Sequence, residues 1–251
     1  MRRTISLKLT LAYDGSAYVG WQRQENGVSI QQRLEEKLEQ ICGRRIVTEG
    51  ASRTDARVHA LGMVVSCRWP IRGLPPPVLR KALNALLPED IRILRIQQEK
   101  QNFHARFNAK SKLYRYYILN TKIADPFRRA TTWFIPHFLD ILAMQKAARY
   151  FVGKHNFSSV AVNPGYERSS MVRHLYHCRV WRCDDEIRIE VKADGFLYKM
   201  VRTMVGTLVE VGLGKRSAKS IATLLEARDR RLAGMTAPPQ GLFLVRVNYG
   251  R

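Results

Sequence analysis

Acidic residues, cysteines and long apolar runs are all scarce in this chain of 251 residues. Its 21 Asp and Glu are outnumbered by 43 Lys and Arg. The four cysteines (Cys42, Cys67, Cys178 and Cys183) form no C-x-x-C pattern, so we expect no metal or thiol-redox site and place them in the core or in strands. No apolar run reaches the roughly 20 residues of a membrane span, and the first ten residues lack a signal-peptide pattern. We therefore expect a soluble, cytoplasmic protein.

The net charge of +22 is the most unusual property of the composition. The basic residues are spread over both halves of the chain and form no long block, which indicates a folded basic surface rather than a charged tail. Such a surface attracts polyanions, and nucleic acid is the leading partner. The chain has no strongly basic amphipathic helix, so an anionic membrane is a weaker alternative.

The first part of the chain alternates strands and helices in a recognisable order. Strands are predicted at 5–11 and 91–96 from their period-two alternation. Between them come a helix that starts at the capping box of Ser29 and Gln32, and a second helix after Pro76-Pro77. Two more strands, at 45–49 and 61–69, lie between the helices. This β-α-β-β-α-β order is the split βαβ arrangement of ferredoxin-like sheets.

The second part of the chain repeats that pattern without repeating the sequence. We predict strands and helices at 112–119, 139–152, 172–182, 186–193, 196–211, about 221–225 and 242–247. The fold class is therefore α+β, with two ferredoxin-like halves at 1–107 and 108–251. We expect their antiparallel sheets to lie side by side. Exposed faces of such sheets commonly bind RNA, although the aromatic signature of an RNA recognition motif is absent.

One loop, GASRTDARVHA at 50–60, carries the leading candidate for catalysis. Asp55 lies between Arg53 and Arg57, in a loop that two predicted strands hold. Neighbouring positive charge favours the ionised carboxylate, which suits a nucleophile or general base better than a general acid. An ordinary turn aspartate that pairs with arginine is the commoner explanation for these residues taken alone.

Two further candidates lie in the second half. Tyr114 and Tyr116 share one face of a strand and Tyr117 the other, so the three cannot all be core residues. A tyrosine ring can stack on a nucleobase, worth roughly 1–3 kcal/mol, but cross-strand packing explains it equally well. Arg202 lies in an apolar helix and needs a carboxylate or phosphate partner, unless it extends to solvent at a domain rim.

Several motifs in the same order resemble the tRNA pseudouridine synthase A family, whose mark is a GRTDAGVHA-like loop. The resemblance extends over nearly the whole chain. It rests on SRTDARVHA at 52–60, YDGSAYVGWQRQ at 13–24, FHARFNAKSKLYRYYILN at 103–120, GFLYKMVRTMVGTLVEVG at 195–212 and TAPPQGLFLVRV at 236–247.

The resemblance implies an isomerase that converts uridine to pseudouridine in tRNA. It implies that Asp55 attacks or deprotonates the nucleoside and that Tyr114 stacks on the base. It also implies a catalytic cleft between the two halves, across which Arg202 pairs with Asp55. Arg53 is implied to occupy the space that the target base leaves. The implied enzyme needs no cofactor or metal, acts on uridines 38–40 of the anticodon stem-loop, and is a homodimer.

The chain departs from the family pattern at Ser52 and Arg57, where the family usually has glycine, and at Asp194-Gly195, where it usually has an Asn-Ala-like pair. A positive φ at Ser52 or Arg57 would cost about 1–2 kcal/mol. Because of these changes, a non-catalytic tRNA-binding protein on the same scaffold remains the main alternative function. An RNA nuclease or base-removing glycosidase is a more distant alternative.

Overall fold

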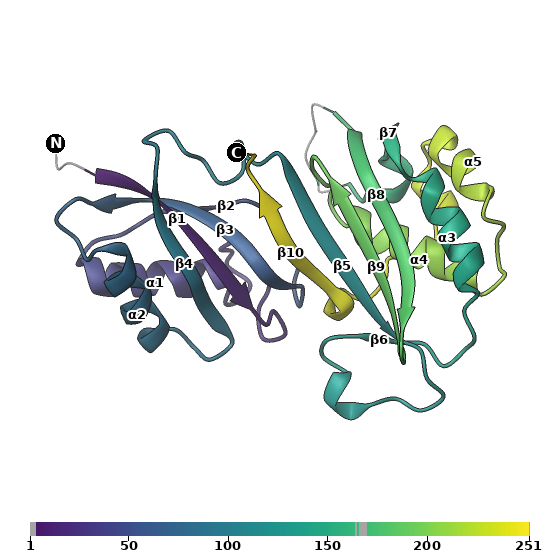
Figure 1. Cartoon of the computed structure of the whole chain (residues 1–251), viewed down its shortest axis with the longest axis horizontal. Helices are drawn as coiled ribbons and strands as arrows, with labels where there is room; N and C mark the ends of the chain where they lie inside the picture. Colours follow the sequence, from purple (N-terminus) through teal and green to yellow (C-terminus); the bar gives the residue numbers. More distant parts are fainter. Residues whose placement is uncertain (1–3, 164, 166–169, 251) are drawn as a thin grey trace. The chain divides into compact units, whose positions relative to one another are not determined.

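The computed structural model describes residues 4–163, 165 and 170–250, which form a mixed α+β fold of two compact units (Figure 1). Unit 1 comprises Met1–Lys110 with Leu244–Arg251, and unit 2 comprises Ser111–Phe243. The sequence placed the boundary between residues 107 and 108 and assigned the last strand to the second half. In the structure, most of that strand belongs to unit 1.

Unit 1 has the predicted β-α-β-β-α-β order. Its strands form the antiparallel order β4-β1-β3, the short β2 also pairs with β3, and the final strand β10 lies on the other side of β3. The elements are β1 (Thr4–Tyr13), α1 (Ile30–Cys42), β2 (Thr48–Gly50), β3 (His59–Pro70), α2 (Pro76–Leu86), β4 (Ile91–Glu99) and β10 (Leu242–Asn248).

The sheet of unit 1 has one buried and one open face. Leu7, Leu9 and Leu11 of β1 are fully buried in the core, which α1 and α2 close from one side (Figure 1). The residues between them, such as Lys8 and Thr10, point to the opposite face. Half of the predicted capping box is confirmed: Ser29 Oγ accepts a hydrogen bond from the Gln32 amide at 3.2 Å, but the Gln32 side chain donates to Glu36 at 2.8 Å. The core residues shared by β1, α1 and α2 are Leu7, Leu9, Leu11, Leu34, Leu38, Leu79 and Leu83.

The named strands belong to one mixed sheet of ten strands rather than to the two sheets that the sequence predicted, and within unit 2 their order is β5-β9-β8-β7, with β6 paired parallel to β5. Helices α3, α4 and α5 gather beside β8 and β9 (Figure 1). The elements are β5 (Ser111–Leu119), β6 (Trp133–Phe134), α3 (Ile141–Tyr150), β7 (Gly153–Asn156), β8 (Val172–Cys183), β9 (Glu186–Ala193), α4 (Met200–Gly212) and α5 (Ser220–Ala227), with 3-10 turns η1 (Pro126–Arg128), η2 (Ser158–Val160), η3 (Arg230–Leu232) and η4 (Pro239–Gly241).

Unit 2 also corrects part of the sequence interpretation. Helix α4 starts at Met200, four residues later than predicted, because Lys199 has a left-handed backbone with φ of 56°. Strands β6 and β7 were not predicted, since a two-residue strand and the polar segment Gly153–Asn156 show no alternation of apolar residues. No helix among the described residues is long and apolar enough to cross a membrane.

Three of the four cysteines lie in strands, as predicted, whereas Cys42 is half-buried at the end of α1. All four are free thiols, on α1, β3 and β8. Cys67 and Cys178 are buried, and burial raises the pKa of each thiol to about 12. At Cys67 the nearby Cys42 raises the pKa further in the same direction. These two thiols therefore stay protonated at neutral pH and behave as small core residues.

Candidate active site

The loop that carries Asp55 runs between β2 and β3 of unit 1. Burial alternates along it, since Thr54 is buried, Asp55 is half-buried, and Arg53 and Arg57 are exposed. Thr54 thus anchors the loop to the core while the carboxylate next to it keeps access to solvent. This is the arrangement that a reactive carboxylate on a fixed loop requires.

The segment after β1 holds this loop through three hydrogen bonds. The hydroxyl groups of Tyr13 and Thr54 lie 2.7 Å apart, and both side chains are buried. The Trp21 amide donates to the Thr54 carbonyl at 3.1 Å, and the Arg57 amide donates to the Tyr18 carbonyl at 3.3 Å. The backbone is therefore fixed on both sides of Asp55.

Two glycines allow the segment to approach the loop this closely. A Cβ atom at Gly15 would lie 2.1 Å from the Val58 carbonyl oxygen. At Gly20, where φ is +113°, a Cβ would lie 2.6 Å from the Thr54 carbonyl oxygen and 3.0 Å from the carbonyl carbon of Asp55. Any larger residue at these positions would push the Asp55 loop away, because both contacts are with backbone.

A buried histidine closes the base of the loop. His59 Nδ1 accepts a hydrogen bond from the Gly15 amide at 3.1 Å and lies equally far from Asp14 Oδ1. Partial burial works to raise the pKa of Asp14, but hydrogen bonds from Ser16 and the proximity of His59 outweigh it, and the pKa lies below its ordinary value.

Arg57 adopts a left-handed backbone conformation with φ of 64°, whereas Ser52 does not. The expected cost of a non-glycine residue therefore falls on one of the two positions that differ from the family pattern. The side chain of Arg57 is exposed, so the strain lies in the backbone.

Tyr114 lies on β5 in unit 2, opposite Val191 of β9. Its ring is 5% exposed and meets Phe196 edge to face, with ring centroids 5.0 Å apart. Tyr116 lies on the same face and is fully buried, and its hydroxyl donates to the Pro238 carbonyl at 2.7 Å. Tyr117 points the other way and contacts Phe243. The predicted distribution of the three rings over two faces is confirmed.

Arg202 extends from α4 and is half-buried. Its Nε donates to the Ala237 carbonyl at 2.7 Å, and the Ala237 amide returns a hydrogen bond to the Arg202 carbonyl at 3.0 Å. Burial raises the pKa of the Tyr116 hydroxyl, and the positive charge of Arg202 opposes part of that rise. The guanidinium is thus held by the segment before η4.

The four residues singled out from the sequence fall into two groups. Arg53 and Asp55 share the loop of unit 1, while Tyr114 and Arg202 both belong to unit 2. That the two groups meet at one nucleotide stays a prediction. The described residues contain no group of three His, Cys, Asp or Glu side chains that could hold a metal ion.

The sequence interpretation missed the residues that fix the Asp55 loop. Tyr13 lay beyond the strand predicted at 5–11, and Thr54 was only a neighbour of the aspartate. The signal was nevertheless present, because Tyr13 and Gly20 both lie in the motif YDGSAYVGWQRQ. Glycines close to an aromatic residue in a loop indicate a tight contact with another segment, but not which segment.

Comparison with known proteins gives a consistent result. A family model described as tRNA pseudouridine synthase matches residues 10–108 and 147–250. A protein of Thermoanaerobacter sp. (strain X514) named tRNA pseudouridine synthase A is 41% identical over 244 residues, which cover 97% of this chain and 99% of that protein.

Two further relatives carry the same name. The protein of Methylacidiphilum infernorum (isolate V4) is 44% identical over 98% of this chain and 96% of its own length. The protein of Exiguobacterium sp. (strain ATCC BAA-1283 / AT1b) is 43% identical over 99% of this chain and 98% of its own length. Among solved structures, a Cbf5-Nop10-Gar1 complex matches with a TM-score of 0.35 and 11% identity over 95% of this chain and 48% of that chain, a likeness too weak to support an argument.

Proposed function

The chain belongs to the tRNA pseudouridine synthase family and is an isomerase of that family, and we propose that it modifies uridines 38–40 of the anticodon stem-loop with Asp55 as the catalytic carboxylate. The observation that supports this role is the loop itself. It keeps Asp55 half-exposed between Arg53 and Arg57, while Tyr13 and Thr54 fix the backbone beside it.

The proposed reaction rearranges one nucleotide and releases only a proton. The N1–C1′ bond breaks, the base turns within the site, and a C5–C1′ bond forms. The C5 proton leaves to solvent, and N1 takes up a proton in exchange. The uridine must first leave its stack, at a cost of a few kcal/mol. Asp55 can attack C1′, add to C6, or remove the C2′ proton, and each route needs the ionised carboxylate.

The other residues have supporting roles in this proposal. Arg202 pairs with Asp55 and keeps it charged, Tyr114 holds the base by stacking, and Arg53 fills the space that the base vacates. The active site then takes residues from both halves of the chain. We also propose that the chain works in the cytoplasm as a homodimer, which light scattering with in-line size-exclusion chromatography would test.

Release of tritium from tRNA labelled at uridine C5 tests the proposal directly. Asp55→Asn removes the carboxylate charge at nearly constant size, so tritium release should fall by roughly 10²–10⁴-fold. Asp185→Asn, at an exposed position between β8 and β9, is the matched control and should keep wild-type activity. Carbodiimide treatment followed by primer extension then maps the modified positions.

The same assay distinguishes the alternatives. Binding of tRNA without tritium release by the wild-type chain would support the non-catalytic tRNA-binding protein instead. Strand scission or free uracil would indicate a nuclease or a glycosidase. Equal activity of Asp55→Asn and the wild-type chain would refute the role of Asp55, and modification away from positions 38–40 would refute the target.

A further inference from the structure

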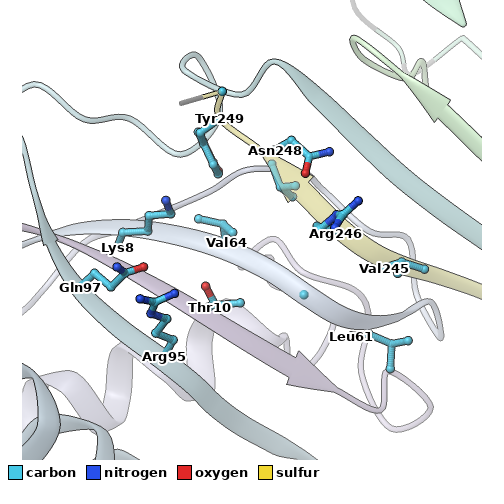
Figure 2. A pocket seen from close by; sticks show the side chains of 13 residues that line it. Lys8, Thr10, Leu61, Val64, Arg95, Gln97, Val245, Arg246, Asn248 and Tyr249 are labelled. Carbon is cyan, nitrogen blue, oxygen red and sulfur yellow. The ribbon is translucent and has the colours of Figure 1, made fainter. Parts of the chain in front are cut away.

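The open face of the unit 1 sheet carries a groove lined by β1, β3, β4 and β10. The groove has a volume of about 560 Å³ and is open to solvent (Figure 2). Thr10, Val64 and Gly62 form its floor, and a Cβ at Gly62 would lie 2.6 Å from the Val245 carbonyl oxygen. The lack of a side chain at Gly62 therefore keeps β3 and β10 close and the floor shallow.

Two arginines from different strands border this groove. The strand register places Arg95 of β4 beside Thr10 of β1, and Thr10 beside Val64 of β3. Arg246 rises from β10 beyond Val64, so the two guanidinium groups lie on either side of the floor (Figure 2). Three strand spacings separate β4 from β10, which makes the groove about 14 Å wide.

The charges of the groove are unbalanced. In the part of the chain that the structure describes, neither Arg95 nor Arg246 makes an ion pair or a side-chain hydrogen bond, and no Asp or Glu lines the groove. Lys8, at one end, differs because it pairs with Glu99 at 3.2 Å. Two exposed guanidinium groups without an acidic partner favour a ligand that carries more than one negative charge.

The chemistry of the lining favours phosphates over bases. Tyr249 supplies the aromatic ring that lines the groove, and this ring already has contacts within the protein. Its hydroxyl donates to the Ala105 carbonyl, and Lys8 Nζ lies 4.6 Å from the ring centroid. The floor offers no free ring on which a base could stack. Guanidinium groups on either side of a floor of small side chains instead match the backbone of a nucleic acid, which is bound without sequence preference.

Strand β3 connects the groove to the Asp55 loop along the chain. The Asp55 loop enters β3 at His59, and Leu61 and Gly62 of the same strand line the groove. We propose that this groove binds the phosphate backbone of the RNA substrate away from the nucleotide that is isomerised, with Arg95 and Arg246 as its phosphate-binding residues. The inference rests on the proposed function for the identity of the RNA.

The double substitution R95Q/R246Q tests this site with the full chain. Equilibrium binding of full-length tRNA should weaken roughly tenfold, and the slope of log K against log salt should become shallower by roughly 1.4 for two lost phosphate contacts. KM for tRNA should rise in parallel, while kcat at saturating tRNA stays at the wild-type value. The matched control is R45Q/R72Q, which removes two exposed arginines outside the groove and should leave binding nearly unchanged.

Three outcomes would overturn the site. The first is that R95Q/R246Q binds tRNA as R45Q/R72Q does. The second is a fall in kcat without a change in Kd, which indicates a structural effect. The third is evidence that R95Q/R246Q removes a different occupant of the groove. A changed oligomeric state by light scattering would indicate a second copy of the chain, and a loss of binding to phosphatidylglycerol vesicles but not to tRNA would indicate a membrane. Tritium release by the wild-type chain is measured separately, so refutation of phosphate binding in the groove can be told apart from refutation of the proposed synthase activity.

Discussion

Arg57 shows how a single backbone angle distinguishes two positions that look alike in the sequence. Ser52 and Arg57 both replace glycines of the family pattern, three residues before and two residues after Asp55. Only Arg57 has a positive φ. A left-handed conformation costs an L-residue about 1–2 kcal/mol, so this chain carries strain beside its catalytic candidate.

Replacing Arg57 by glycine should therefore stabilise the protein. Arg57→Gly removes the strain but increases the freedom of the unfolded chain, so we expect a net gain of about 1 kcal/mol in the free energy of unfolding. Denaturant unfolding followed by circular dichroism measures it. Ser52→Gly should instead lower the free energy of unfolding, because the backbone at Ser52 needs no glycine and only the added entropy of the unfolded chain remains. Equal effects of the two substitutions would contradict the argument.

At the scale of residues, the sequence identifies candidate site residues more reliably than it predicts the contacts those residues make. The motif around Asp55 was sufficient to name the loop and to expect strain at one of two positions. It could not predict that Tyr13 and Thr54 share a buried hydrogen bond, because 41 residues separate them and no local pattern specifies their pairing. Contacts of this kind depend on how β1 and β3 align.

Among the elements, those with a clear period and a capping signal were predicted best. Helix α1 begins after Ser29 and ends before Gly43, whose left-handed conformation closes the helix as a glycine there usually does. Helix α4 was predicted to start at residue 196, because its apolar residues continue upstream without a stop signal. Apolar character alone does not separate a buried turn from the first turn of a helix.

The end of β1 holds the Asp55 loop through the Tyr13–Thr54 hydrogen bond, and this contact can be removed selectively. Tyr13→Phe leaves the buried Thr54 hydroxyl without that partner, which should cost about 1–3 kcal/mol of stability. If the hydrogen bond orients Asp55, kcat should also fall while KM for tRNA stays constant, because binding uses other surfaces. A shift of Asp55 by about 1 Å is enough for a 10²-fold loss.

A double-mutant cycle separates positioning from general destabilisation. Tyr13→Phe and Thr54→Val should each lower kcat, and the double variant should lose no more than the more damaging single change, because both remove the same bond. Tyr249→Phe, which removes an equally short hydrogen bond to Ala105, is the control and should keep kcat. Additive effects on kcat, or a change confined to thermal stability, would show that Tyr13 does not position the loop.

On the scale of the whole molecule, the last strand joins unit 1 although it follows all the helices of unit 2. Three contacts explain this: the Lys110 amide donates to the Asn248 carbonyl at 2.8 Å, Tyr249 donates to Ala105, and β10 approaches β3 closely at Gly62. The alternation of residues 242–247 predicted a strand but not its neighbour. A strand's partner is decided by long-range pairing, which a single sequence does not reveal.

The net charge of +22 leads to the broadest prediction, that tRNA binding depends steeply on salt. Each phosphate contact releases condensed counterions, so the affinity falls with a slope of roughly 0.7–0.9 per contact in a plot of log K against log salt. For about five contacts, raising monovalent salt from 50 to 200 mM should weaken binding by roughly 100- to 500-fold. Fluorescence anisotropy with labelled tRNA measures this, and the melting temperature in the same buffers controls for unfolding. A slope shallower than about −1 would mean that few of these cations reach phosphates, and the basic surface would then need another explanation.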